Sequence, residues 1–514
     1  MGLIAILALL ISLVSLSLVV GLILKEPWKL VQRESPSVLG CLLHRIPGEL
    51  YGSLIQPSLR LTSLKAHWDY LLLLLLFAMA MTIRLVHLDV LPSNVTADEL
   101  DNLQTAYLII EGHGPGWYGL DWKPSPSFST RLISISVETF GANITSLRLP
   151  SAILSSFAIL PFYFLARQVV SKPVALIAVL LLGSNLWYLH FSRSGWENVH
   201  GALYGTSAAL CLTLALRGQS WTLYAATGLF CTLGLLGFFS SAFIVAGIVA
   251  YLPFAIFLDR ARWKSVLLGY ALIAAITILL FVPQLKIFIA EWDYATRRIQ
   301  TISVFAIDGE YLGDNSIPVI LTHQAIRVIQ SFFLMDSPDY GLWGRYIPIG
   351  RGFLNFGTSF LFWIGLFASF YYWRTTILWW AMFLAFLVPQ VFSTGSPNAA
   401  TATPTAPFMY LFVALGIYVI FNCRRKLIAR LHPSWVSRSL ATITLLFLVT
   451  WLAISDIKDY YLWIKSPDAL LARAPYVDFH RFSEWQGLAR QEAIEGRLLP
   501  HDDWLIWLDQ HHVD

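Results

Sequence analysis

The sequence is poor in charge and in cysteine. Only 13% of its 514 residues are Asp, Glu, Lys or Arg, whereas a soluble globular domain carries about 25%. Its four cysteines, Cys41, Cys211, Cys231 and Cys423, are far apart and fit neither a disulfide framework nor a zinc site. A Walker loop, a G-x-G-x-x-G that opens a helix, an H-E-x-x-H motif and a basic face interleaved with aromatic residues are missing too. These absences exclude a soluble enzyme, a secreted disulfide scaffold, a disordered hub and a nucleic-acid-binding protein.

Apolar residues make up 57% of the chain, and its mean hydropathy is +0.63. Apolar stretches of about 17–24 residues recur from end to end, which is the length that crosses a hydrocarbon layer of about 30 Å. The sequence therefore predicts an all-α polytopic membrane protein with about 11–12 transmembrane helices. We expect the spans at 1–24 and near 69–87, 147–168, 173–191, 201–216, 221–238, 241–258, 265–287, 353–373, 375–392, 405–423 and 439–455.

The charged residues between the spans predict the orientation of the chain. Segment 25–68 carries six Lys and Arg against three acids, and the other basic connections share its side of the membrane in one threading. Because basic connections face the cytoplasm, the acidic segments 88–146 and 456–514 fall outside. We predict three parts: an N-terminal helix and basic cytoplasmic segment (1–68), a transmembrane domain (69–455) with outer loops 88–146 and 288–352, and an outer-face tail (456–514).

The spans contain few charged residues except at their ends. A transporter usually places ionisable side chains at mid-membrane depth, whereas long loops are commonly functional. The large outer loops therefore favour an enzyme that works at the outer face. A multi-pass transporter or flippase for a glycolipid or another solute is the alternative.

The first outer loop contains a predicted helix. Leu100, Leu103, Tyr107 and Ile110 follow helical spacing, so we expect an amphipathic juxtamembrane helix on the membrane surface that ends at the glycines beginning with Gly112.

Two acids stand at the start of this helix. Thr96-x-x-Glu99 is a capping box, and acids in a first turn also complement the helix dipole. An ionised carboxylate at the boundary between water and lipid would equally suit a general base. The residues alone leave both interpretations of Asp98 and Glu99 open.

Several short motifs share their order and spacing with a known family. They are Arg84-Leu, Pro92 and Asp98-Glu99, then Trp122-Lys-Pro-Ser-Pro126, Phe140-Gly141, Leu147-Arg-Leu-Pro-Ser151 and Phe191-Ser-Arg-Ser-Gly-Trp-Glu-Asn198. Over about residues 69–260 the chain resembles the GT-C membrane glycosyltransferases, in particular glycosyltransferase family 39, which includes protein O-mannosyltransferases and lipid A aminoarabinose transferases. The resemblance implies a GT-C fold and the transfer of one sugar from a polyprenyl-phosphate carrier with inversion. It also implies that Asp98 is the catalytic base and Glu99 an acid that orients the acceptor.

Such a reaction needs positive charge for the leaving phosphate. A phosphodiester leaving group does not have to be protonated, so fixed cations can replace a general acid. The predicted substrate-binding residues are Lys123, Arg131, Arg193, Glu197, Asn198, Arg345 and Arg351. Basic residues beside a span also commonly reach lipid phosphates, which is the alternative for Arg345 and Arg351.

We expect no required cofactor. A divalent metal ion is compatible with the chemistry, but the histidines of the tail, such as His511 and His512, do not place three ligands on one helical face. The expected partners are a polyprenyl-phosphate-linked sugar, a protein, glycan or lipid acceptor, and membrane lipids, without nucleic acid. The expected location is the bacterial plasma (inner) membrane.

Overall fold

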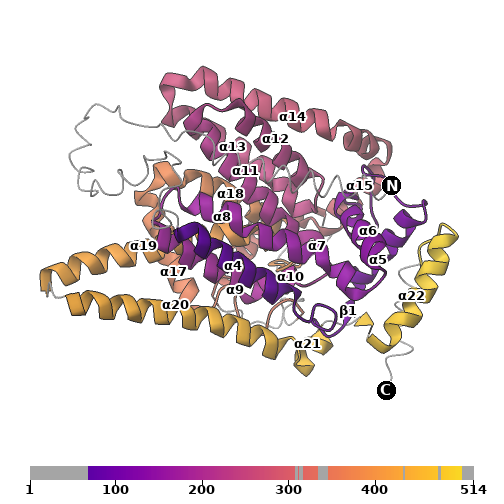
Figure 1. Ribbon diagram of the computed structural model, residues 1–514. Coiled ribbons are helices and arrows are strands. Elements are labelled where there is room, and N and C mark those ends of the chain that lie inside the picture. Colours follow the sequence, from indigo (N-terminus) through magenta and orange to yellow (C-terminus); the bar gives the residue numbers. More distant parts are fainter. Residues whose placement is uncertain are drawn as a thin grey trace.

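The computed structural model is built almost entirely of helices (Figure 1). It describes residues 68–306, 311, 316–333, 345–431, 435–472, 476–477 and 479–499. The predicted span 1–24, nearly all of the basic segment 25–68 and the end of the tail lie outside the described residues. The prediction of an all-α polytopic membrane protein is confirmed.

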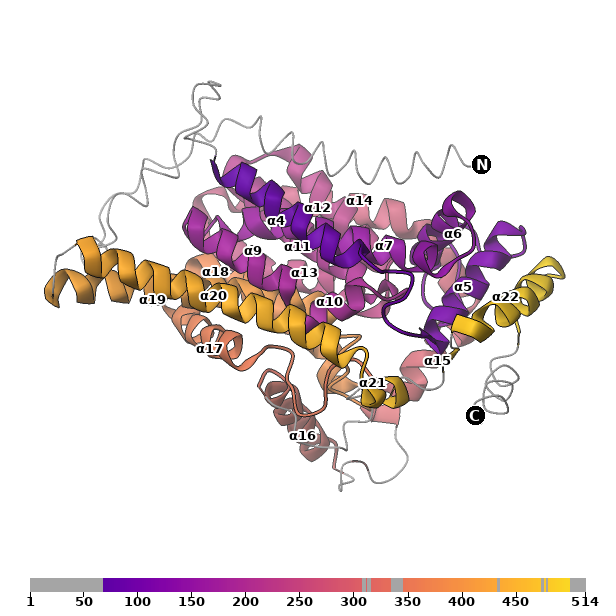
Figure 2. The same cartoon turned by 60° about the horizontal axis from the view of Figure 1, so that its bottom comes forward.

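Each predicted span within the described residues corresponds to a helix or to a pair of helices. The helices are α4 (Trp68–Leu85), α7 (Ile144–Phe157) with α8 (Ile159–Ala166), α9 (Lys172–Ser184) with α10 (Leu186–Ser192), α11 (His200–Gly218), α12 (Trp221–Leu235), α13 (Phe243–Leu258), α14 (Trp263–Ala290), α17 (Phe356–Tyr371), α18 (Trp373–Phe392), α19 (Ala406–Leu431) and α20 (Trp435–Trp463). In Figure 2, α19 and α20 run side by side along one edge of the molecule, as they do in Figure 1.

Not every described helix meets a strict requirement of length and hydropathy for a membrane span. Among the described residues, seven helices are long and apolar enough to cross a membrane, or eight if the bent pair α9–α10 is one span. Helices α12 and α17 are apolar but have only 15 and 16 residues. Other helices are longer than the apolar runs that predicted them: α14, α19 and α20 have 28, 26 and 29 residues.

The spans differ in how deeply they are buried in the protein. The apolar windows of 197–218 and 403–422 are 89% and 83% buried, whereas that of α4 is only 22% buried. Helices α11 and α19 therefore form the centre of the bundle. Helix α19 also packs closely on α17, because a Cβ at Gly365 or Gly416 would collide with the backbone of the facing helix.

The span α9–α10 is broken by a 60° bend at Asn185. A break leaves backbone groups without helical partners, and these need other partners inside a membrane protein. Asn185 accepts a hydrogen bond from the backbone N–H of Tyr188 at 2.9 Å. The buried Arg84 donates from Nη1 to the carbonyl of Gly183 at 3.1 Å. The bend is thus held by side chains from two parts of the chain.

The predicted helix of the first outer loop is α5 (Ala97–Ile110), which is followed by Gly112 with a φ of +87°. Every residue from Ala97 to Ile109 except Asp98 is buried, because α5 packs between α6 (Phe128–Phe140) and α22 (Phe479–Ile494). The expectation of a helix with one face on the membrane surface is therefore wrong.

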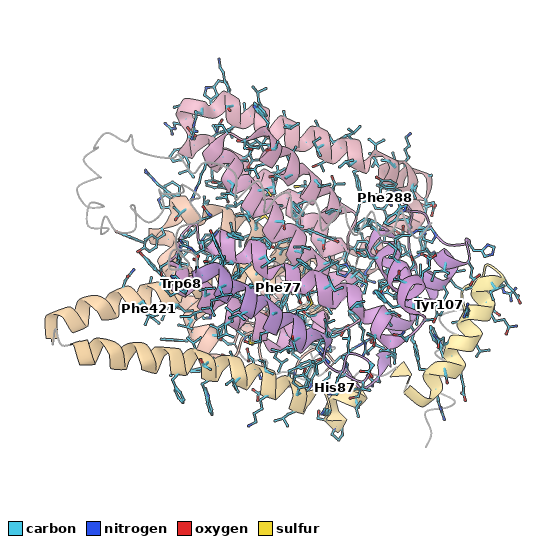
Figure 3. The ribbon with its side chains drawn as sticks, viewed as in Figure 1. Trp68, Phe77, His87, Tyr107, Phe288 and Phe421 are labelled. Carbon is cyan, nitrogen blue, oxygen red and sulfur yellow. The ribbon has the colours of Figure 1, made fainter. Side chains whose placement is uncertain are left out.

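The C-terminal tail covers α5. Strand β2 (Tyr476–Val477) pairs antiparallel with β1 (Val95–Thr96), directly before α5. From α22, Gln486 donates to the hydroxyl of Tyr107 at 2.9 Å, and Figure 3 shows Tyr107 on the side of α5 nearest α22. The remaining short helices are α15 (Trp292–Ile302), α16 (Ile317–Gln330) and α21 (Pro467–Ala472).

Candidate functional site

Glu99 lies in a fully buried ion pair. Its Oε1 is 2.9 Å from Nε of Arg148, and neither side chain is exposed. The carboxylate also accepts hydrogen bonds from the backbone N–H groups of Thr96 at 3.1 Å and Gly195 at 2.8 Å. The capping interpretation of Glu99 is therefore confirmed. This carboxylate is buried and engaged by Arg148 and the backbone, so its contacts do not fit the acceptor-orienting role that the resemblance implies for Glu99.

Arg148 connects the loop after α4 to the start of α5. Besides Glu99, its guanidinium donates to the carbonyls of Leu88, Pro92 and Asn94 at 3.3, 3.0 and 2.7 Å. The sequence motif included Arg148 without giving it a role. The structure shows that the Arg148–Glu99 pair supports the turn that presents Asp98.

Arg193 is not placed to bind a phosphate, contrary to the sequence prediction. Its side chain is fully buried. Its guanidinium donates to the carbonyls of Ile83, Arg84, Val86, His87 and Leu91, which lie at the end of α4 and in the following loop. Arg193 thus holds this loop in place.

Asp98 is more exposed to solvent than the neighbouring acids Glu99, Asp121 and Glu197. Its side chain is 25% exposed, and it lies between two predicted cations. Nη2 of Arg345 donates to Oδ2 at 3.0 Å, and Nζ of Lys123 lies 3.7 Å from Oδ1. The structure thus brings together three residues from different parts of the sequence, and their arrangement keeps the carboxylate next to positive charge.

Lys123 lies at the centre of the charged cluster. Its Nζ is 3.5 Å from Oε1 of Glu197, and its side chain is only 5% exposed. Burial lowers the pKa of Lys123, but Glu197, Asp98 and Asp121 more than offset this effect, so that its pKa is raised. Lys123 therefore stays positively charged at neutral pH.

Aromatic rings surround the ammonium group of Lys123. The ring centroids of Trp122, Trp196 and Phe238 lie 4.6, 5.3 and 5.8 Å from Nζ. Such cation–π contacts attract a cation while limiting its contact with water. The site can therefore hold a desolvated positive charge beside Asp98.

Asn102 was not predicted as a site residue. Its Nδ2 donates to Oε2 of Glu197 and to the carbonyl of Gly195, both at 2.9 Å, and its Oδ1 accepts from Nε1 of Trp122 at 2.9 Å. Asn102 thus orients Glu197 and Trp122. It follows Asp98 by four residues, so helical spacing could have identified it.

Asp121 shapes the turn that carries Lys123. Its Oδ1 accepts from the backbone N–H groups of Lys123 and Ser125, both at 3.0 Å. Burial, with the nearby Glu197 as the second cause, raises the pKa of Asp121 to about 7. Asp121 therefore adds less negative charge to the cluster at neutral pH than an ordinary aspartate.

Helix α15 brings a further cation close to the cluster. The hydroxyl of Tyr294 donates to the carbonyl of Asp121 at 2.8 Å. Arg298, four residues later, lies close enough to lower the pKa of Lys123, and its guanidinium is 5.8 Å from the ring centroid of Phe239. The sequence identified loop 288–352 as functional but not Arg298.

Three predicted residues do not join the Asp98 cluster through described contacts. Arg131 forms no ion pair with a described residue. Asn198 is buried, and its Oδ1 has no hydrogen-bond partner in the described part of the chain. Arg351 pairs instead with Asp456 and Asp459 of α20. Within the described ranges, no group of three or more His, Cys, Asp or Glu is arranged to hold a metal ion.

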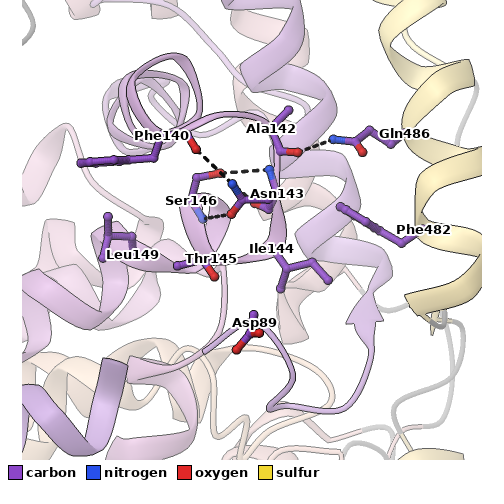
Figure 4. Close-up of a pocket in the computed structure, with 10 residues that line it drawn as sticks. All are labelled: Asp89, Phe140, Ala142, Asn143, Ile144, Thr145, Ser146, Leu149, Phe482 and Gln486. Atoms are coloured by element: carbon purple, nitrogen blue, oxygen red, sulfur yellow. Dashed lines mark hydrogen bonds between the residues drawn. The ribbon is translucent and has the colours of Figure 1, made fainter. Parts of the chain in front are cut away.

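A cavity of about 600 Å³ lies beside α7, separate from the charged cluster (Figure 4). It is lined by Asp89, Phe140, Ala142, Asn143, Ile144, Thr145, Ser146, Leu149, Phe482 and Gln486. None of the residues around Asp98 lines it. The charged cluster, rather than this cavity, therefore defines the candidate site.

The fold is that of the GT-C polytopic membrane enzymes. The oligosaccharyltransferase of Archaeoglobus fulgidus, solved with a tethered acceptor peptide, has a TM-score of 0.52 and 16% identity; the match covers 85% of this chain and 60% of that chain. The apo structure of ArnT from Cupriavidus metallidurans has a TM-score of 0.49 and 14% identity, over 80% of this chain and 77% of that chain.

Sequence comparisons agree with the fold. Residues 125–287 match the family model described as dolichyl-phosphate-mannose-protein mannosyltransferase. The undecaprenyl phosphate-alpha-4-amino-4-deoxy-L-arabinose arabinosyl transferase of Pseudomonas aeruginosa (strain LESB58) is 27% identical over 175 residues; the match covers 32% of this chain and 30% of that protein. The predicted resemblance to the GT-C membrane glycosyltransferases is thus confirmed. The family-model match begins after Asp98 and Glu99, so it includes neither acid.

Proposed function

We propose that this protein is a membrane glycosyltransferase that moves one sugar from a polyprenyl-phosphate carrier to an acceptor. The observation that carries the proposal is the partly exposed carboxylate of Asp98 between Arg345 and Lys123. The similarity to a transferase named for an undecaprenyl-phosphate sugar supports this class of donor.

In the proposed reaction Asp98 is the general base. Its carboxylate takes the proton from an acceptor hydroxyl or amine as the acceptor oxygen or nitrogen bonds to the anomeric carbon. The bond from that carbon to the phosphate oxygen breaks at the same time, and its electron pair leaves with the polyprenyl phosphate. A single displacement of this kind inverts the anomeric carbon.

The cations near Asp98 are proposed to bind the phosphate of the donor. Lys123 and Arg345 contact Asp98 directly, and the charge of Arg298 acts on Lys123 by lowering its pKa. Fixed positive charge stabilises the negative charge that develops on a leaving phosphate, and it does so most strongly where water is excluded. The burial of Lys123 fits this role.

The stereochemistry of the product tests the proposed reaction. Purified protein is incubated with a polyprenyl-phosphate sugar of known anomeric configuration and with candidate protein, glycan and lipid acceptors. We expect free polyprenyl phosphate and a glycosylated acceptor of inverted configuration, assigned by NMR. A retained configuration would contradict the single displacement.

We also propose that the site faces outward from the bacterial inner membrane, which the distribution of basic connections supports. His113, in the predicted outer loop 88–146, and Ala261, in a basic connection, are both exposed. In otherwise cysteine-free protein, His113→Cys should react with an impermeant thiol reagent in cells whose outer membrane is opened and whose inner membrane is intact. Ala261→Cys should react only after the inner membrane is permeabilised. The reverse pattern would place the site on the cytoplasmic side.

A further inference from the structure

Arg351 is fixed to helix α20. Its Nη1 donates to Oδ2 of Asp459 at 2.7 Å, and its Nη2 pairs with Oδ1 of the buried Asp456. The same oxygen of Asp456 accepts from Nδ2 of Asn355 at 2.9 Å. Asn355 also caps α17 by accepting from the backbone N–H of Thr358 at 2.8 Å. Residues 351–355 are therefore held by both α17 and α20.

Residues 345–350, which include the Arg345 that reaches Asp98, lie directly before residues 351–355. Arg345 is six residues before Arg351, and the backbone N–H of Arg351 donates to the carbonyl of Pro348 at 3.2 Å, which closes a turn between them. Tyr346 packs edge-on against Trp196, with ring centroids 5.2 Å apart. Tyr346 and Ile347 are buried, whereas Ile349 in the turn is exposed. Because the two arginines are only six residues apart, we expect a shift at Arg351 to reach Arg345.

We propose that Arg351 is a positioning residue that acts through Arg345 and touches no substrate. By fixing the segment to α20, it keeps the guanidinium of Arg345 at Asp98, where the donor phosphate binds in the proposed function, on which this inference rests. This role replaces the direct substrate binding predicted for Arg351. The carboxylates of Asp456 and Asp459 would repel a phosphate from Arg351, which agrees with the replacement.

Kinetics of single and double variants test the coupling. Displacing a binding group by about 1 Å can cost about 10²-fold in rate, so Arg351→Ala should raise KM for the polyprenyl donor and lower kcat/KM by about 10–10²-fold. Arg351→Ala should have little further effect in an Arg345→Ala background, because the group that it positions is gone. Arg351→Lys should restore part of kcat/KM. Equal losses in both backgrounds would overturn the proposal.

The control is Arg497→Ala, which also removes an arginine paired with two acids, here Glu492 near the end of α22 and Glu495 directly after it. Its kcat/KM should equal that of the wild type. If Arg351→Ala does not fold, Asp459→Asn removes only the more exposed partner and should shift KM in the same direction. An unchanged KM in folded Asp459→Asn would then contradict the proposal.

A cross-linking measurement separates this proposal from the proposed function, because it needs no transfer. Asp98→Cys and Arg345→Cys are introduced into protein whose four native cysteines are replaced. Oxidative cross-linking between the two positions, followed by peptide mass spectrometry, should be several-fold slower when Arg351→Ala is added, and unchanged with Arg497→Ala. An unchanged rate with Arg351→Ala overturns the positioning role, whereas absence of transfer by wild-type protein overturns only the proposed function.

Discussion

Asp98→Asn is expected to slow sugar transfer by about 10²-fold or more and to leave the protein folded. General-base catalysis contributes about 10²–10⁴-fold, and an amide cannot take up the acceptor proton. Asparagine keeps the size of the side chain. It loses the interaction with the helix dipole, which contributes about 0.3–1 kcal/mol, and the charge opposite Arg345 and Lys123, but Lys123 keeps Glu197 as its counter-charge. Transfer rates of the wild type and of Asp98→Asn check the catalytic effect, and thermal unfolding of the same two proteins checks that the variant stays folded.

Thr96→Ala is the matched variant at the same helix start. Thr96 caps α5 with Glu99, and such a cap contributes about 1 kcal/mol to stability. This variant should lose stability and keep most of its transfer rate, the opposite balance to Asp98→Asn. Near-normal turnover of Asp98→Asn would leave Asp98 with only its structural roles, at the helix dipole and opposite Lys123 and Arg345, and would remove it as the base.

Glu99→Gln is expected to destabilise the fold strongly. It leaves the guanidinium of Arg148 buried without its counter-charge, and removing one partner of a buried ion pair costs about 3–5 kcal/mol. The loop after α4 should loosen with it, because Arg148 binds three carbonyls there. Thermal unfolding in detergent and the yield of monodisperse protein check the expectation.

Arg497→Ala is again the control, since it breaks an exposed ion pair on α22. Such pairs contribute little to stability, so its unfolding temperature should match that of the wild type. If Glu99→Gln were as stable as this control but inactive, Glu99 would have a direct part in the chemistry and our assignment of it to the framework would be wrong.

The sequence predicted the features that depend on a local pattern of residues, namely the positions of the helices and the two ends of α5. Apolar runs located the helices because an apolar run of span length is itself the signal. The start of α5 followed from the capping box of Thr96 and Glu99, and its end from Gly112. The pairing of Asp98 with Lys123 and Arg345 was anticipated only as a set of candidate residues, without their contacts.

Features that depend on distant segments could not be predicted. Helix α5 looked like a surface helix because the segment that covers it, α22, comes nearly 400 residues later. Arg193 resembled a phosphate ligand because nothing in its neighbourhood marks the free carbonyls that it binds, about 100 residues earlier. The sequence did not identify Arg298, because its effect on Lys123 depends on where α15 packs in the fold.

The central claim is that this protein is an enzyme rather than a transporter, and transfer without a sealed compartment tests it most directly. Purified protein in detergent is given a polyprenyl-phosphate donor with a labelled sugar, together with an acceptor, and the label on the acceptor is followed over time. We expect transfer by the wild type and its loss in Asp98→Asn. Movement of the glycolipid across sealed vesicles, without transfer from any polyprenyl donor in detergent, would contradict it.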